Sequence, residues 1–314
     1  MKKHLKFLTV AIVIVFSIEF LLRAAFGFCD TVLFKESKNY EYIVQPNQVR
    51  HRFGRHVAYN SHSMRSEEID SAAIKILCFG DSVINGGVLT DQDSLATTLL
   101  STEVSQAFDK NVQFLNISAG SWGPDNCFAY LKENGNFSAK LILLFVNSHD
   151  AYDNMTFEKV VDVHRNYPSH QHLSAIYELW NRYLYPRLMK FTKDDNSSTD
   201  GLGINKKKKM SQFNPGFRNF IAYSKRQAIP LMVYLHAGKD ELQQGSYNEQ
   251  GQEIIKLLKN TNIPVLKDLN LGLEASDFRD GIHLNEKGQK NITGNIFNAL
   301  KDRQFDFLVD RQKF

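Results

Sequence analysis

The sequence predicts an α/β protein, a doubly wound sandwich built on a five-stranded parallel sheet and preceded by one N-terminal transmembrane helix. From residue 73 onward, short apolar runs alternate with longer segments in which apolar residues recur at helical spacing. Such alternation is typical of parallel strands joined by crossover helices. The transmembrane helix is predicted by an almost unbroken apolar stretch over residues 7–22, which lies close behind the N-terminus.

The N-terminal stretch fits either a cleaved signal peptide or an uncleaved membrane anchor. Three lysines precede it and Arg23 closes it. Phe26 and Phe28 intrude where a cleavage site needs small residues, so we favour an anchor over residues 1–29. The lysines place its N-terminus in the cytoplasm by the positive-inside rule. The rest of the chain then faces outward, into the periplasm if the source is a Gram-negative bacterium.

Residues 30–72 are rich in Tyr, His, Arg and Asn and have no long apolar period. They predict an irregular lead-in that wraps on the main domain, residues 73–314. The predicted strands of that domain are Ile74–Phe79, Val112–Ile117, Leu141–Val146, Leu231–Leu235 and Ile263–Leu266. Helices are predicted between the first two strands and before the last one, and a final helix is predicted over residues 286–300.

An insertion over about residues 151–229 interrupts this rhythm, because one crossover helix would need far fewer residues. Within it, residues 172–191 predict an amphipathic helix, and residues 194–205 predict a loop. The insertion could shape a substrate cleft. For Trp180 and its apolar neighbours, the pattern favours packing on the domain.

The charge distribution argues against nucleic acid as a partner. Net charge is only +4, and no basic helix carries interleaved aromatic residues. The densest cationic run, Lys206–Lys209, lies in a polar stretch that reads as a solvated loop.

Two short motifs, far apart in the chain, carry the residue types of a serine hydrolase. Gly80-Asp81-Ser82 follows the first predicted strand, and Asp280-Gly281-Ile282-His283 lies near the C-terminus. A serine hydroxyl becomes a good nucleophile only when a base accepts its proton. His283 is the candidate base for Ser82, and Asp280 can orient its ring. The chain order Ser, Asp, His is admissible because such triads are defined by geometry and roles.

These motifs, in this context, resemble those of the SGNH hydrolases, the GDSL-type esterase and lipase superfamily. The resemblance covers most of the chain from about Val44 and implies a flavodoxin-like three-layer sandwich. It implies that Ser82 is the nucleophile and that its N–H donates to the oxyanion. The lead-in is similar to that of membrane-anchored bacterial members, whose anchors often carry a Glu and an Arg near the end, as Glu19 and Arg23 do here.

The two middle motif blocks depart from the family pattern. The family uses a Gly N–H five residues after a strand-ending Asn, whereas here Gly120 stands four residues after Asn116 and Ser121 stands five after it. We assign Gly120 first as the second oxyanion donor. The third donor in the family is the Asn of Gly-x-Asn-Asp, and here His149 occupies that place, with Asn147 as the alternative.

The sequence hypothesis is therefore a membrane-anchored serine esterase that hydrolyses an acyl ester, acetyl above all, on a carbohydrate or cell-surface polysaccharide. The substrate class rests on the resemblance and on location. The chemistry calls for no metal and no organic cofactor. One alternative is an O-acyltransferase on exported polysaccharide with the same residues. The other is a non-catalytic, membrane-tethered assembly component.

Overall fold

The central sheet of the protein is parallel and five-stranded. The computed structural model describes residues 2–192 and 212–308. Its sheet has the spatial order β6-β5-β7-β8-β9, which is 2-1-3-4-5 in chain order, the flavodoxin-like arrangement. The strands are β5 (Ile74–Gly80), β6 (Val112–Ser118), β7 (Leu141–Asn147), β8 (Leu231–His236) and β9 (Val265–Lys267). The predicted fold class is confirmed, and only the last strand begins later than expected.

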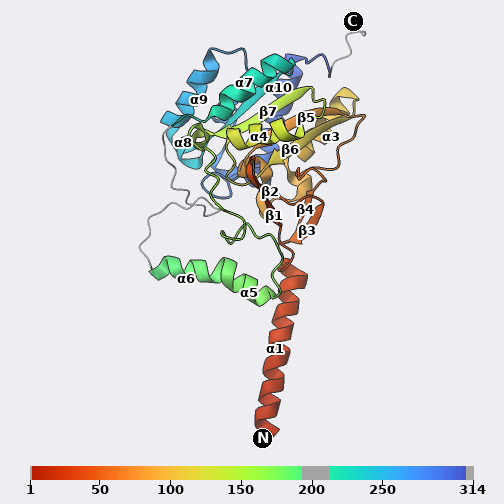
Figure 1. The fold of residues 1–314 in the computed structure, drawn as a ribbon, viewed down its shortest axis with the longest axis vertical. Helices are drawn as coiled ribbons and strands as arrows, with labels where there is room; N and C mark the ends of the chain where they lie inside the picture. The colour runs from red at the N-terminus through yellow and green to blue at the C-terminus, as the bar shows by residue number, and fades with distance from the viewer. Residues whose placement is uncertain (1, 193–211, 309–314) are drawn as a thin grey trace.

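Helices cover both faces of this sheet (Figure 1). The main ones are α3 (Ala96–Phe108), α4 (Pro124–Asn134), α7 (Pro215–Gln227), α9 (Glu249–Lys259) and α10 (Glu286–Arg303). Right-handed crossovers put α3 on one face and α4, α7 and α9 on the other, since the chain reverses direction across the sheet after β6. In agreement, α10 packs against α3, and α4 packs against α7. Shorter helices are α2 (Ser82–Asn85) and α8 (Lys239–Gln244), and 3₁₀ turns occur at Gly87–Leu89, Gln92–Ser94, Ser148–Ala151, Asp268–Asn270 and Ala275–Asp277.

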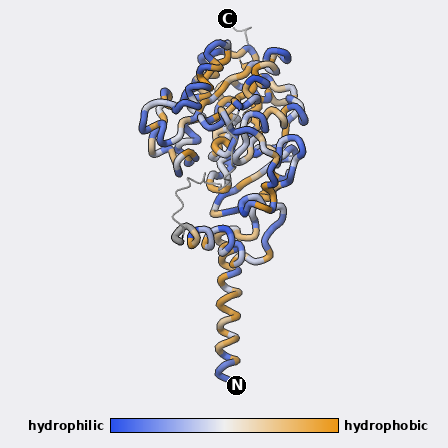
Figure 2. Tube along the Cα trace, turned by 60° about the vertical axis from the view of Figure 1, so that its left-hand side comes forward, coloured by the Kyte–Doolittle hydropathy of each residue, from blue (hydrophilic) through white to orange (hydrophobic). Residues whose placement is uncertain are grey.

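The N-terminal helix α1 (Lys2–Phe26) projects away from the folded domain (Figure 1). Figure 2 shows it as an almost continuously hydrophobic helix whose N-terminal end is hydrophilic. None of its residues is buried. Among the described residues, it is the one helix long and apolar enough to cross a membrane, although a signal sequence would have the same length and composition.

The lead-in is more regular than its composition predicts, because it forms two antiparallel hairpins. They are β1 (Phe34–Ser37) with β2 (Glu41–Val44), and β3 (Gln48–Arg52) with β4 (Arg55–Tyr59). The second hairpin turns at Phe53-Gly54, where both residues have positive φ. Such two-residue turns match the twist of paired strands, but Phe in place of Asn or Asp hides the signal. The description of residues 30–72 as irregular is therefore corrected.

The helix predicted in the insertion is present and begins three residues later than expected. It runs as α5 (Ala175–Leu179), a π-helical turn η4 (Trp180–Leu184) and α6 (Tyr185–Thr192). We call these residues, 175–192, the insertion helix. Trp180 is 48% exposed, so the expectation that it packs on the domain is wrong. The face that carries Ala175 and Glu178 packs there instead. The predicted loop over residues 194–205 and the cationic run at 206–209 lie outside the described residues.

Candidate active site

Ser82 stands at a sharp turn between β5 and α2. Asp81 caps that helix, since its Oδ1 accepts a hydrogen bond from the N–H of Val83 at 2.9 Å. Gly80 is required at the turn, because a Cβ there would lie 2.8 Å from the side chain of Ile84 and 3.0 Å from Cβ of Phe145. The strand and the short helix therefore meet closely, and the Ser82 side chain lies at the carboxyl end of a central strand, where ligands bind in this fold.

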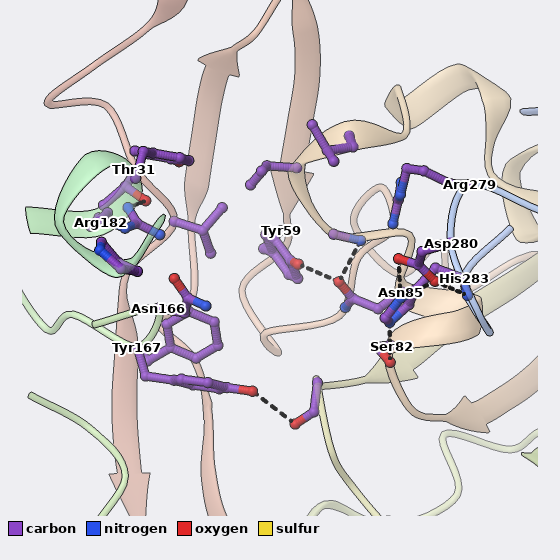
Figure 3. A pocket seen from close by; sticks show the side chains of 18 of the residues that line it. Thr31, Tyr59, Ser82, Asn85, Asn166, Tyr167, Arg182, Arg279, Asp280 and His283 are labelled. Atoms are coloured by element: carbon purple, nitrogen blue, oxygen red, sulfur yellow. Dashed lines mark hydrogen bonds and ion pairs between the residues drawn. The ribbon is translucent and has the colours of Figure 1, made fainter. Parts of the chain in front are cut away.

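Ser82, His283 and Asp280 form a continuous hydrogen-bonded chain (Figure 3). Nε2 of His283 lies 2.9 Å from Oγ of Ser82. Nδ1 lies 2.8 Å from Oδ2 and 3.0 Å from Oδ1 of Asp280. A carboxylate can only accept, so Nδ1 carries the proton and Nε2 is left to accept from the serine hydroxyl. This is the tautomer that a general base needs.

Asp280 is held as a carboxylate by its surroundings. Burial alone would raise its pKa, but the His283 ring and the N–H groups of Ile282 and His283 donate to it and hold the pKa well below its ordinary value. Those backbone bonds to Oδ1 measure 3.0 and 2.8 Å. The side chain is still 42% exposed, so solvent screens part of its charge.

A second, fully buried His–Asp pair lies behind the loop that carries His283. Nδ1 of His236 lies 2.6 Å from Oδ2 of Asp268, and its Nε2 lies 2.8 Å from the carbonyl oxygen of Ile282. Both partners are acceptors, so both ring nitrogens donate. Burial alone would lower the pKa of His236, but Asp268 and the Ile282 carbonyl raise it. The resulting imidazolium fixes the position of Ile282, the residue next to His283. Sequence reasoning missed this function of His236, because only the fold brings the end of β8 beside that loop.

Arg65, from the lead-in, holds the segment that follows Ser82. The guanidinium is fully buried and donates to the carbonyl oxygens of Asn85, Gly87 and Thr90. A planar group with five donors suits three carbonyls gathered around it. Sequence reasoning missed this function, because only the fold brings the lead-in against the turn after Ser82.

Of the oxyanion donors proposed from the sequence, some line the cavity beside Ser82 and others do not. Gly120 lines the same cavity as Ser82, and its carbonyl oxygen accepts from the Tyr42 hydroxyl at 2.7 Å. Nδ2 of Asn147 donates to Oδ2 of Asp81 at 2.9 Å, so that amide positions the turn instead of facing a substrate. His149 is not among the residues that line the cavity. Gly120 and Ser82 thus remain the proposed donors with access to a bound ester.

The possible metal ligands near Ser82 form a tight cluster. Asp81, His149 and Asp150 place one ligand atom each within 4.8 Å of the others. Oδ2 of Asp150 accepts from the N–H of Asn147 at 2.8 Å, and both oxygens of Asp81 accept hydrogen bonds. Because these carboxylates already stabilise the turn, their arrangement is accounted for by hydrogen bonding.

Three parts of the chain build the cavity beside the triad, whose volume is about 460 Å³. Thr31, Val32, Phe34 and Tyr59 come from the lead-in, and Asn166, Tyr167, Arg182, Tyr183, Pro186 and Arg187 come from the insertion. Figure 3 shows Arg182 and Thr31 across the cavity from Ser82 and His283. Asn85 also lines it, and donates through Nδ2 to the Ser118 carbonyl and hydroxyl oxygens at 3.1 Å. The insertion thus contributes to the wall of the cavity, and its part in binding a substrate stays a prediction.

No family model and no curated protein matches the chain. Solved structures do match it at low identity. A member of the lipolytic protein G-D-S-L family from Veillonella parvula DSM 2008 is 15% identical, with a TM-score of 0.40, over 73% of this chain and 99% of that chain. The psychrotrophic esterase EstA from Pseudoalteromonas sp. is 13% identical, with a TM-score of 0.41, over 73% and 98%. The lipase/acylhydrolase from Enterococcus faecalis is 13% identical, with a TM-score of 0.42, over 73% and 96%.

Proposed function

We propose that the protein is a serine esterase of the SGNH type, anchored to a membrane through residues 7–22. The observation that carries the proposal is the hydrogen-bonded chain from Ser82 through His283 to Asp280 at the wall of a cavity. Each member has the partner, the distance and the tautomer that nucleophilic catalysis by serine requires.

The reaction has two halves. Ser82 Oγ attacks the ester carbonyl carbon while Nε2 of His283 takes the hydroxyl proton, and the N–H groups of Ser82 and Gly120 donate to the oxyanion. His283 then gives the proton to the departing alcohol oxygen, which leaves an acyl group on Ser82. Water attacks this acyl-enzyme, loses a proton to His283, and the carboxylic acid departs as Ser82 regains its hydrogen. Asp280 stabilises the imidazolium in both halves.

The proposed substrate is an acyl ester, acetyl above all, on a carbohydrate or polysaccharide at the outer side of the membrane. The cavity is lined by Tyr59, Tyr167 and Tyr183 together with Arg187 and Arg279. A lining of aromatic surface with a few placed polar groups suits a ligand that has both apolar faces and hydroxyls. The lysines at the start of α1 support an extracytoplasmic position for the domain.

The test is hydrolysis of nitrophenyl acetate by the detergent-solubilised full chain. We expect turnover by the wild type and by Ser61→Ala, which removes an exposed hydroxyl. We expect its loss in Ser82→Ala. Equal rates in the wild type and in Ser82→Ala would contradict the proposal. Acyl release that occurs only when a sugar acceptor is added, and that still needs Ser82, would replace hydrolysis by acyl transfer.

A further inference from the structure

The insertion helix carries an exposed apolar stripe that no described part of the chain covers. Its large side chains recur at helical spacing and are Tyr177, Trp180, Leu184 and Leu188, with Leu173 just before the helix. Leu173 is 97% exposed, and Tyr177 and Leu188 are 56% and 51% exposed. A contiguous apolar surface of this kind, on a helix, marks a surface that contacts another apolar phase.

The opposite face of the insertion helix is fastened to the globular part of the protein. Glu178 is fully buried there, and its Oε1 accepts from Arg52 at 2.5 Å and from Arg182 at 2.9 Å. Its Oε2 accepts from the N–H of Cys29 at 2.6 Å. Arg182 also donates to the Thr31 hydroxyl at 2.6 Å. Because this face is fixed against the domain, the apolar stripe is turned away from the domain.

The start of the insertion helix is held at the level where α1 leaves its apolar stretch. The carboxylate of Glu19 accepts from the N–H groups of Ala175 at 2.7 Å and Ile176 at 3.0 Å. Arg23 donates to the carbonyl oxygen of Leu173 at 2.5 Å. Figure 1 shows the insertion helix extending sideways from the domain-proximal end of α1, crosswise to it. When α1 spans a bilayer, the insertion helix therefore lies at the bilayer surface.

From these observations we propose that the insertion helix docks on the lipid surface, with its apolar stripe among the headgroups and upper acyl chains. Trp and Tyr favour this zone because their rings are apolar and their N–H or O–H groups reach water. Amphipathic helices bind there through buried apolar area. The proposal rests on the membrane anchoring in the proposed function but not on its ester chemistry. Arg182, Tyr183 and Pro186 of the same helix line the cavity, so docking would set one wall of the active site against the membrane.

Lipid is favoured over a second copy or another protein because α1 fixes the position of the stripe. Glu19 and Arg23 belong to α1 and contact the chain at Leu173–Ile176, so the stripe begins beside the membrane-spanning segment itself. The insertion helix is thus continuous with the anchor at the bilayer surface. A protein partner would have to displace lipid from that position.

The test is quenching of Trp180 fluorescence by brominated phosphatidylcholine, in the full chain reconstituted in vesicles. The chain has two tryptophans, and Trp122 is buried in the domain core, so Trp180→Phe isolates the signal of Trp180. We expect lipid brominated near the headgroup to reduce the Trp180 emission roughly twofold, and lipid brominated deep in the acyl chain to reduce it less. As a matched control, Lys259→Trp in the Trp180→Phe background reports from the end of α9, far from α1 in Figure 1, and should not be quenched.

The outcomes separate this proposal from the rest of the account. Quenching of Trp180 that is lost in Leu184→Glu/Leu188→Glu, with nitrophenyl acetate turnover retained, supports docking. Unquenched Trp180 in protein that resists carbonate extraction would overturn docking and leave the anchor intact. Quenching equal to that of the tryptophan at position 259 would also overturn it. Extraction of the wild type by carbonate would refute the anchor, and with it the docking, while the esterase assay stands separately.

Discussion

Replacement of Asp280 tests how much its charge and its hydrogen bond to His283 each contribute to catalysis. Two opposite unit charges about 4 Å apart attract by about 4 kcal/mol at an effective dielectric constant of about 20. The Asp280 side chain is 42% exposed, so solvent reduces this to about 2–3 kcal/mol for the imidazolium formed in the transition state. Asp280→Ala should therefore lower kcat by roughly 30- to 150-fold.

Asp280→Asn should be worse than Asp280→Ala. The Asn Oδ1 would keep the bonds from the N–H groups of Ile282 and His283, which leaves its Nδ2 facing Nδ1 of His283. An amide N–H at that place forces the ring proton onto Nε2. Nε2 can then no longer accept a hydrogen bond from the Ser82 hydroxyl. The loss should then move toward roughly 10⁴-fold.

The assay is kcat for nitrophenyl acetate near neutral pH, with thermal melting to show that each variant is folded. Asp302→Ala and Asp302→Asn change an exposed carboxylate on α10 and serve as matched controls that should retain wild-type kcat. The reasoning is refuted if Asp280→Ala stays within about threefold of the wild type, or if Asp280→Asn is the more active of the two.

Four further predictions concern charged groups outside the triad. Glu178→Gln leaves the buried Arg52 without its carboxylate partner and should destabilise the protein by about 3–5 kcal/mol. Glu286→Gln, at an exposed ion pair, should change stability by less than about 1 kcal/mol. Equal melting temperatures of the two variants would contradict this. His236→Gln should lower kcat roughly 10- to 100-fold with little change in KM, because the Ile282 carbonyl loses its donor, while His51→Gln should have no effect. The pKa of His236 is raised in the folded protein, so the charged ring contributes to the free energy of unfolding in full below about pH 6.5. This contribution is lost as pH rises through the folded pKa. The denaturation midpoints of the wild type and of His236→Gln should therefore converge at alkaline pH. A chelator should leave nitrophenyl acetate turnover unchanged, and a loss restored by a divalent cation would show that the Asp81 cluster holds a metal.

The sequence predicted the sheet well because its strands are buried on both faces. Continuous apolar runs such as Leu141–Val146 leave little ambiguity about strand position, and alternation with helices indicates parallel order. The Gly80-Asp81-Ser82 and Asp-x-x-His motifs were equally visible in the sequence, because each is a local pattern with a fixed place relative to the sheet. The structure brings Ser82 and His283 together, and their catalytic roles stay predictions. The hairpin at Phe53-Gly54 was missed because its turn lacks the usual residue before Gly.

The residues that hold the site in place could not be predicted from the sequence, because their hydrogen bonds join segments that are distant in the chain. Arg65 reaches carbonyls that follow Ser82, and His236 reaches the carbonyl of Ile282 only because β8 ends beside that loop. The exposure of Trp180 also depended on tertiary structure. Periodicity shows that one face of a helix is apolar, but not which face the domain covers, and here the buried charge of Glu178 determined it.

Covalent labelling would show whether Ser82 is a nucleophile that His283 activates. The full chain would be treated with a fluorophosphonate, digested and analysed by mass spectrometry, because such reagents form stable adducts with activated serines. We expect one adduct, on the peptide that contains Ser82, and labelling that slows by roughly 10³-fold or more in His283→Gln, which lacks the base and whose folding is checked by thermal melting. An adduct on another serine would refute Ser82 as the nucleophile, and labelling of Ser82 at the same rate in His283→Gln would refute its activation by His283.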